Sequence, residues 1–152
     1  MIQKKQLRVS AIENGTVIDH IPAKSLFNVI TILGLHKFDN LITFGTNMES
    51  QRFGKKAIIK IADKYFANDE INRIAIAAPH AKLNIIRDYT VIEKRVVEVP
   101  DHIEGIVKCV NPKCITNVEA VVPKFKVLDK ISVSLKCQYC EKITDQEHMV
   151  YL

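Results

Sequence analysis

The sequence of 152 residues predicts an α+β protein, in which an N-terminal ferredoxin-like antiparallel sheet with two helices precedes a small all-β domain. The predicted elements of the first part run strand, helix, strand, strand, helix, strand, which is the order of a split βαβ fold. The pattern breaks at Glu98–His102, where a proline stands among charged residues, and all four cysteines follow this break. We therefore assign residues 1–99 to one domain and residues 100–152 to a second.

Alternating apolar and polar residues predict the strands, whereas apolar residues three and four positions apart predict the helices. The expected strands of the first domain are Gln6–Ile12, Thr16–Ile21, Leu41–Phe44, Lys56–Ile61, Ala81–Ile86 and Tyr89–Val97. The two expected helices are Ala23–Leu33, ended by Gly34, and a segment capped by Asn68 or Asp69 and closed by Pro79. In the second domain, the expected strands are Val121–Val127 and Ile131–Leu135.

The cysteines form one Cys-x4-Cys pair and one Cys-x2-Cys pair, 22 residues apart: Cys109, Cys114, Cys137 and Cys140. Two short loops that each carry two thiolates are typical of a tetrahedral zinc site. Because the four ligands leave no open coordination position, the spacing predicts one structural Zn²⁺ per chain. A small domain needs such a cross-link because it buries little apolar surface. Disulfide pairing is the alternative, and a reducing cytosol disfavours it.

Hydropathy and charge argue against a membrane protein and against nucleic-acid binding by the second domain. No apolar run approaches the roughly 20 residues that span a bilayer, so we expect no membrane segment and a cytoplasmic location. The net charge of +5 arises before the cysteines: residues 1–100 carry 15 basic and 10 acidic side chains, and residues 101–152 carry 7 of each. A neutral second domain disfavours nucleic-acid binding, which needs a basic surface. The basic excess of the first domain fits either solubility or an anionic ligand.

Polar side chains on the expected strands form three groups: Asp19 with His20, Lys55 and Lys56 with Lys60, and Asn84 through Lys94. If these groups meet in space, the lysines suit a polyphosphate, and Asn84 with Tyr89 suits a base. Lysines on strands are also common on a solvated face, and spacing alone leaves both interpretations open. The chain has no glycine-rich phosphate loop, His-x-x-x-His or Gly-x-Ser-x-Gly motif, so we expect no catalytic residues.

Four stretches of the chain, in order, carry a family resemblance. They are GTVIDHIPA at residues 15–23, GKK followed by IK within residues 54–60, the stretch from Pro79 to Lys94, and the cysteine pairs, the second within KCQYCEK at 136–142. Together they resemble the regulatory chain of aspartate carbamoyltransferase. The resemblance implies a regulatory, non-catalytic subunit in pyrimidine biosynthesis that binds CTP as inhibitor and ATP as activator. It also implies a regulatory homodimer, a catalytic-chain partner and a dodecamer of two catalytic trimers and three regulatory dimers.

The resemblance further implies which residues act. The nucleotide would be bound by Ala11, Ile12, Val17, Asp19, His20, Lys56, Lys60, Asn84, Ile86, Tyr89, Val91 and Lys94. Within this set, the lysines and His20 would contact the ribose or the phosphates. Asn111 and Glu141, beside the cysteines, would face the catalytic chain on which the zinc domain docks. Three residues depart from the family pattern: Ser10, where an acidic residue is usual, and Lys113 and Gln138 in the docking loops.

Two functions from other classes remain as alternatives. A zinc-ribbon protein that binds nucleic acid is favoured by the isoelectric point near 9.0 and by the Cys-x2-Cys loop. Salt-dependent retention on DNA or RNA would support it, whereas co-purification with a catalytic chain would support the regulatory function. A free-standing enzyme is the third interpretation, and the absence of catalytic motifs argues against it.

Overall fold

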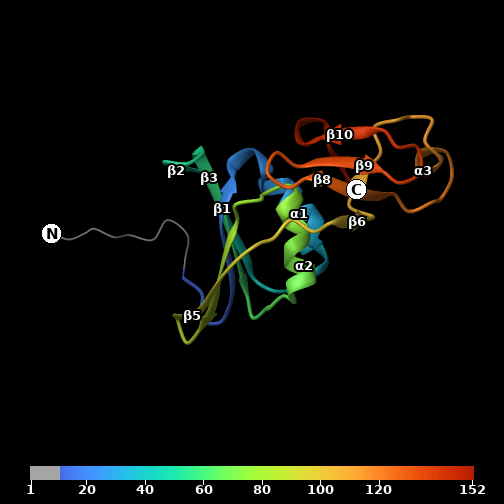
Figure 1. Ribbon diagram of the computed structural model, residues 1–152. Helices are drawn as coiled ribbons and strands as arrows, with labels where there is room; N and C mark the ends of the chain where they lie inside the picture. Colours follow the sequence, from blue (N-terminus) through green and yellow to red (C-terminus); the bar gives the residue numbers. More distant parts are fainter. Residues whose placement is uncertain (1–10) are drawn as a thin grey trace.

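The computed structural model describes residues 11–152. Most of the expected strand Gln6–Ile12 therefore lies outside the described residues, and Ala11 and Ile12 are not in a strand. Figure 1 shows a sheet on one side, the helices α1 and α2 beside it, and the C-terminal strands beyond the helices. Within residues 11–152, no helix is long and apolar enough to cross a membrane.

Short elements make up both parts of the chain. The helices are α1 (Leu26–Leu33), α2 (Asn68–Asn72) and α3 (Ile115–Val118). The strands of the N-terminal part are β1 (Gly15–Pro22), β2 (Ile42–Ser50), β3 (Gly54–Ala62), β4 (Lys82–Arg87) and β5 (Thr90–Val96). Those that follow are β6 (His102–Glu104), β7 (Val107–Lys108), β8 (Lys124–Asp129), β9 (Ser134–Cys137), β10 (Ile143–Asp145) and β11 (Val150–Tyr151). Single 3-10 turns occur at Ala23–Ser25, Leu35–Lys37, Arg73–Ile76 and Gln146–His148.

The N-terminal sheet has the strand order β2-β3-β1-β4-β5, and all its pairs are antiparallel. Strand β3 lies between β1 and β2, which are joined through α1, and β1 lies between β3 and β4, which are joined through α2. This is the split βαβ arrangement, so the predicted ferredoxin-like fold is confirmed. Strand β5 extends the sheet as a hairpin with β4.

One face of this sheet packs on the helices. Ile18 of β1, Ile59 of β3 and Leu83 of β4 are at most 1% exposed and pack with Leu26 and Val29 of α1. Because successive side chains of a strand point to opposite faces, the residues between these core positions face away from the helices. We call this second surface the open face.

Glycine sets the end of the first helix. Gly34 adopts φ 64°, and its N–H donates to the carbonyls of Ile30 and Thr31. A left-handed residue that satisfies the last carbonyls is a frequent helix end, so the predicted stop at Gly34 is confirmed.

The C-terminal part contains a four-stranded sheet of order β10-β9-β8-β6 and the two-stranded pair β11-β7. Its core combines apolar side chains such as Phe125 and Leu135 with three of the cysteines. The mainly β character is as predicted, with the single turn α3 added. This core adjoins the first one: Ile76 packs in it, and Tyr151 contacts both.

Several local predictions differ from the structure. The two strands expected in the second domain begin three residues later than predicted, as β8 and β9. Strand β2, which was expected to end at Phe44, runs on to Ser50, so that only a short turn separates it from β3. The second helix begins after Ala67, whose N–H donates to the Glu70 carboxylate at 3.1 Å, so the caps expected at Asn68 or Asp69 were wrong. The second helix also changes to a 3-10 turn at Arg73 instead of continuing to Pro79. The side chains of residues 74–78 are all buried, so packing outweighs the helical spacing of the apolar residues.

We expect the substitution Gly15→Ala to destabilise the fold by about 3 kcal/mol. Gly15 has φ 137°, and a methyl group there would overlap the carbonyl oxygen of Ile61 on the paired strand. Gly54→Ala is the control, since Gly54 has φ 76° but open space around it, and we expect a loss of about 1 kcal/mol from backbone strain alone. Urea unfolding measures both, and equal losses would contradict the steric argument.

Candidate functional site

The four cysteines converge at one end of the C-terminal part. Cys109 follows β7, Cys114 precedes α3, Cys137 ends β9 and Cys140 lies in the turn before β10. All four sulfur atoms lie within 4.8 Å of one another. The Cys109–Cys140 sulfurs are 3.6 Å apart and the Cys114–Cys137 sulfurs are 3.7 Å apart, so the closest pairs join the two loops. In a tetrahedron with metal–sulfur bonds of about 2.3 Å, the sulfurs would be about 3.8 Å apart, which these separations match.

The electrostatics of this cluster favour a cation. Burial, aided by the adjacent thiols and partly opposed by a backbone hydrogen bond at Asn111, raises the pKa of the Cys109 thiol to about 12. Burial acts in the same direction on Cys140, but hydrogen bonds from the Lys142 backbone, the Asn111 side chain and neighbouring thiols outweigh it and lower the pKa to about 7. Four thiolates this close repel one another, so ionising all of them requires a bound positive charge. The donor set therefore fits a soft divalent metal.

Exposed side chains surround the two cysteine loops. Ile115 and Val118 on α3 are exposed, as are Tyr139 between the second pair of cysteines and Ile143 just after it. Asn111 lies in the first loop, where its side-chain oxygen accepts the Lys113 N–H. Glu141, also exposed, lies in the second at φ 67°. Apolar side chains exposed around a rigid loop pair are typical of a protein contact surface.

On the open face, four strands contribute one row of side chains. In the sheet register, Val17 of β1 lies opposite both Lys60 of β3 and Asn84 of β4, and Asn84 lies opposite Lys94 of β5. Directly opposed residues point to the same face. The register therefore brings Lys60 of the lysine group and the group from Asn84 to Lys94 onto one face, with two lysines and an amide in line. Ile86 and Val91, also opposed, lie next to this row.

Lys60 is the more buried of the two lysines in the row, with 8% of its surface exposed. Burial lowers the pKa of its amine, and the negative charge of Asp19 partly offsets this shift. A desolvated ammonium is stabilised by nearby negative charge. Lys94 is exposed at the edge strand of the same row.

A β-bulge shapes one end of the open face. His20 adopts φ 61° where the β1–β3 register shifts, and its N–H donates to the Asp19 carboxylate. The Lys56 amine lies 2.9 Å from the same carboxylate. Arg52 and Lys82 join His20 and Lys56 in lining a pocket of about 360 Å³. These two cations were not among the predicted site residues, because only the folded sheet brings them there.

At the other end, the segment that enters β1 lies along the β4–β5 turn. The Glu13 carbonyl accepts the N–H of Tyr89, and the Asn14 side chain accepts the N–H of Asp88. Ala11 and Ile12 lead directly into these contacts. Tyr89 itself is 68% exposed in the turn.

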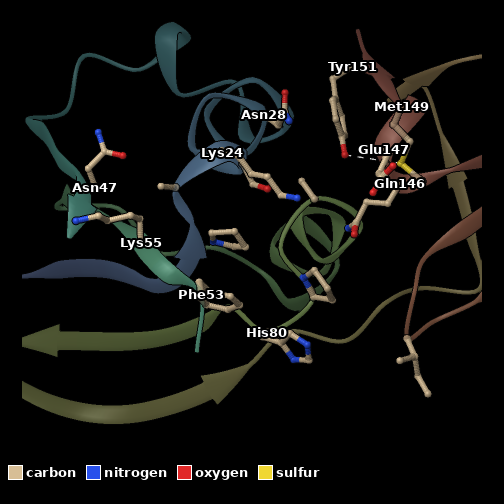
Figure 2. Close-up of a pocket in the computed structure, with 16 residues that line it drawn as sticks. Lys24, Asn28, Asn47, Phe53, Lys55, His80, Gln146, Glu147, Met149 and Tyr151 are labelled. Carbon is tan, nitrogen blue, oxygen red and sulfur yellow. Dashed lines mark hydrogen bonds between the residues drawn. The ribbon is translucent and has the colours of Figure 1, made fainter. Parts of the chain in front are cut away.

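A cleft of about 1000 Å³ separates the N-terminal sheet from the C-terminal segment (Figure 2). None of the nucleotide contacts implied by the family resemblance lines it, although Lys55 of the lysine group does. In Figure 2 the Lys24 amine extends toward the C-terminal side, whereas the Lys55 amine lies on the opposite side of the cleft. The lining also includes the acidic Glu147, and Gln146 donates across it to the Ile76 carbonyl at 2.8 Å. Because its charged groups do not converge, the cleft is a boundary between the two parts rather than a formed ligand site.

Comparison with known proteins covers nearly the whole chain. Residues 7–98 match the family described as aspartate carbamoyltransferase regulatory chain, allosteric domain, and residues 101–150 match its metal binding domain. The chain is 54% identical to the aspartate carbamoyltransferase regulatory chain of Bacteroides fragilis over 98% of its own length and 97% of the relative's. It is 54% identical to that of Thermococcus sibiricus, with 96% of each chain covered. The regulatory chain of Pyrococcus furiosus is 48% identical, with 95% of this chain and 97% of the relative covered.

These relatives are named as regulatory chains, which confirms the expectation of a non-catalytic subunit and implies a separate catalytic chain as partner. The match to a metal binding domain agrees with the clustered cysteines. The chain belongs to the family of aspartate carbamoyltransferase regulatory chains.

Proposed function

We propose that this chain binds nucleoside triphosphates on the open face, with CTP as inhibitor and ATP as activator of aspartate carbamoyltransferase in pyrimidine biosynthesis. The observation that carries the proposal is the row of Lys60, Asn84 and Lys94 across three strands. Two ammonium groups flanking an amide combine charge for a phosphate with donor and acceptor atoms for a base. The proposed contacts are those implied by the resemblance, from Ala11 to Lys94.

The burial of Lys60 supports a ligand of high negative charge. An ammonium that has lost water gains more from a phosphate than an exposed one does, since charge interactions strengthen away from solvent. Lys56, Arg52 and Lys82 extend the cationic surface toward the bulge, while Tyr89 offers an exposed side chain at the other end. The open face thus has a cationic end and an aromatic end, as a nucleotide requires.

We propose that Cys109, Cys114, Cys137 and Cys140 hold one structural Zn²⁺. Bound there, the metal would supply positive charge and cross-link the two loops. Asn111 and Glu141 would then contact the catalytic chain, together with the exposed apolar side chains of α3 and the second loop. All four donors are cysteines, which leaves no open position for a substrate and agrees with a structural role.

We further propose a cytoplasmic assembly in which three regulatory homodimers bridge two catalytic trimers, with residues 1–99 as the nucleotide domain and 100–152 as the docking domain. An effector can shift such an assembly only if it binds one quaternary state more tightly than the other. The contacts of Tyr151 with both cores and of Gln146 with Ile76 supply a physical connection between the two domains.

Replacing Lys94 by alanine should weaken CTP binding by about 1.5–3 kcal/mol, because a charge-assisted bond to phosphate is lost. Lys37→Ala is the matched control, since Lys37 is an exposed lysine in the turn after α1, outside the row. Calorimetric titration of CTP into each variant measures the effect. Unchanged affinity in Lys94→Ala, or an equal loss in Lys37→Ala, would remove Lys94 from the site.

Removing the metal with a chelator should unfold the chain from about residue 101 onward and release the catalytic chain, while CTP still binds the N-terminal domain. Metal binding supplies about 10–16 kcal/mol of folding free energy in small zinc domains, and here it joins loops that share one small core. Hydrogen exchange and CTP titration of the same sample distinguish the two parts. Loss of CTP binding together with the metal would contradict independent domains.

A further inference from the structure

The Cys-x4-Cys loop is closed by a side chain that lies outside it. Asn117 of α3 donates its side-chain amide to the carbonyl of Cys109 at 2.9 Å and to the carbonyl of Asn111 at 2.7 Å. Both acceptors belong to the first half of the loop, whereas Asn117 follows its second cysteine. The two bonds therefore tie the beginning of the loop to the helical turn after its end.

The second cysteine is held by its own contacts. The N–H of Cys114 donates to the same Asn111 carbonyl at 3.0 Å, and the Thr116 hydroxyl donates to the Cys114 sulfur at 3.2 Å. The backbone of Asn117 in turn donates to the Cys114 carbonyl at 2.8 Å. Cys109 and Cys114 are thus fixed relative to one another by protein hydrogen bonds, in addition to whatever a metal contributes.

We propose that Asn117 is a positioning residue for the metal loop, holding Cys109 and Asn111 against the α3 turn so that the first cysteine pair is arranged for the metal. The inference rests on the metal site proposed above. A ligand pair that is already ordered loses little freedom when the metal binds and does not separate easily, so the main consequence is slow release of the metal. The same clamp orders Asn111, the proposed contact with the catalytic chain.

The test is the substitution Asn117→Asp, which keeps the size of the side chain and removes both N–H donors. We expect the zinc-loaded full-length variant to bind one metal ion and to release it to a chromophoric chelator about 10–100-fold faster than the wild type. The cobalt(II)-substituted variant should keep the absorption of a tetrahedral thiolate site, because the four ligands are unchanged.

The matched control is Asn40→Asp. Asn40, just before β2 in the N-terminal part, makes the same kind of bond, from its side-chain amide to the Ala62 carbonyl at 2.9 Å. This variant should release zinc at the wild-type rate. Equal acceleration in both variants would show a general loss of stability and overturn the inference, as would a wild-type rate in Asn117→Asp.

Two further outcomes keep the test decisive. If Asn117→Asp does not fold, Asn117→Ser takes its place, because the serine hydroxyl is shorter and can donate only one hydrogen bond. The Asn117→Ser variant must release zinc faster than the wild type, and an unchanged rate overturns the inference. If the wild-type chain binds no metal, the proposed metal site is wrong. If the wild type binds one metal ion and the variant releases it no faster, the metal site stands and only the role of Asn117 is wrong.

Discussion

Strand β1 pairs with β3 along one edge and with β4 along the other, and this double pairing fixes the position of the open face. Ile18 is directed toward the helices and has no exposed surface, so Val17 and Asp19 must point the other way. The same register aligns Lys60 and Asn84 on either side of Val17. A slip of β3 by one residue would bury Lys60 under the helices and expose Ile59, so burial of the apolar face specifies the lysine positions.

The two parts of the chain share structure at their boundary, although each has its own core. Residues 73–76 form a 3-10 turn whose Ile76 packs in the C-terminal core, while β11 returns Tyr151 from the end of the chain to touch both. Burial raises the pKa of the Tyr151 phenol to about 12, so it stays neutral here. A change in the angle between the two parts would have to repack these side chains, and close-packed side chains resist gradual displacement.

The sequence was sufficient to predict the fold and the cysteine cluster because both depend on local pattern. Alternation and helical spacing gave the strand and helix order, and a four-thiolate site needs only residue type and loop length. The sequence did not predict on which face of the sheet each lysine lies. Lys55 and Lys56 formed one group in the sequence, yet they point to opposite faces, and Arg52 and Lys82 joined Lys56 only through the hairpin and register. The prediction that the second helix continues to Pro79 was also wrong. Its residues are buried against two cores, and this packing outweighed the helical spacing of its apolar residues.

A cysteine site with no open position can affect other molecules only through the shape of its loops. The first loop is held by hydrogen bonds from Asn117, and the second lies against it, with short Cys109–Cys140 and Cys114–Cys137 sulfur separations. Exposed apolar side chains project from the elements next to both loops. A contact surface made of loops costs binding energy if the loops must be ordered on association. In the proposed assembly, loops that are already ordered would lose little freedom when the catalytic chain binds, so that most of the ordering cost would fall on the folding of the regulatory chain.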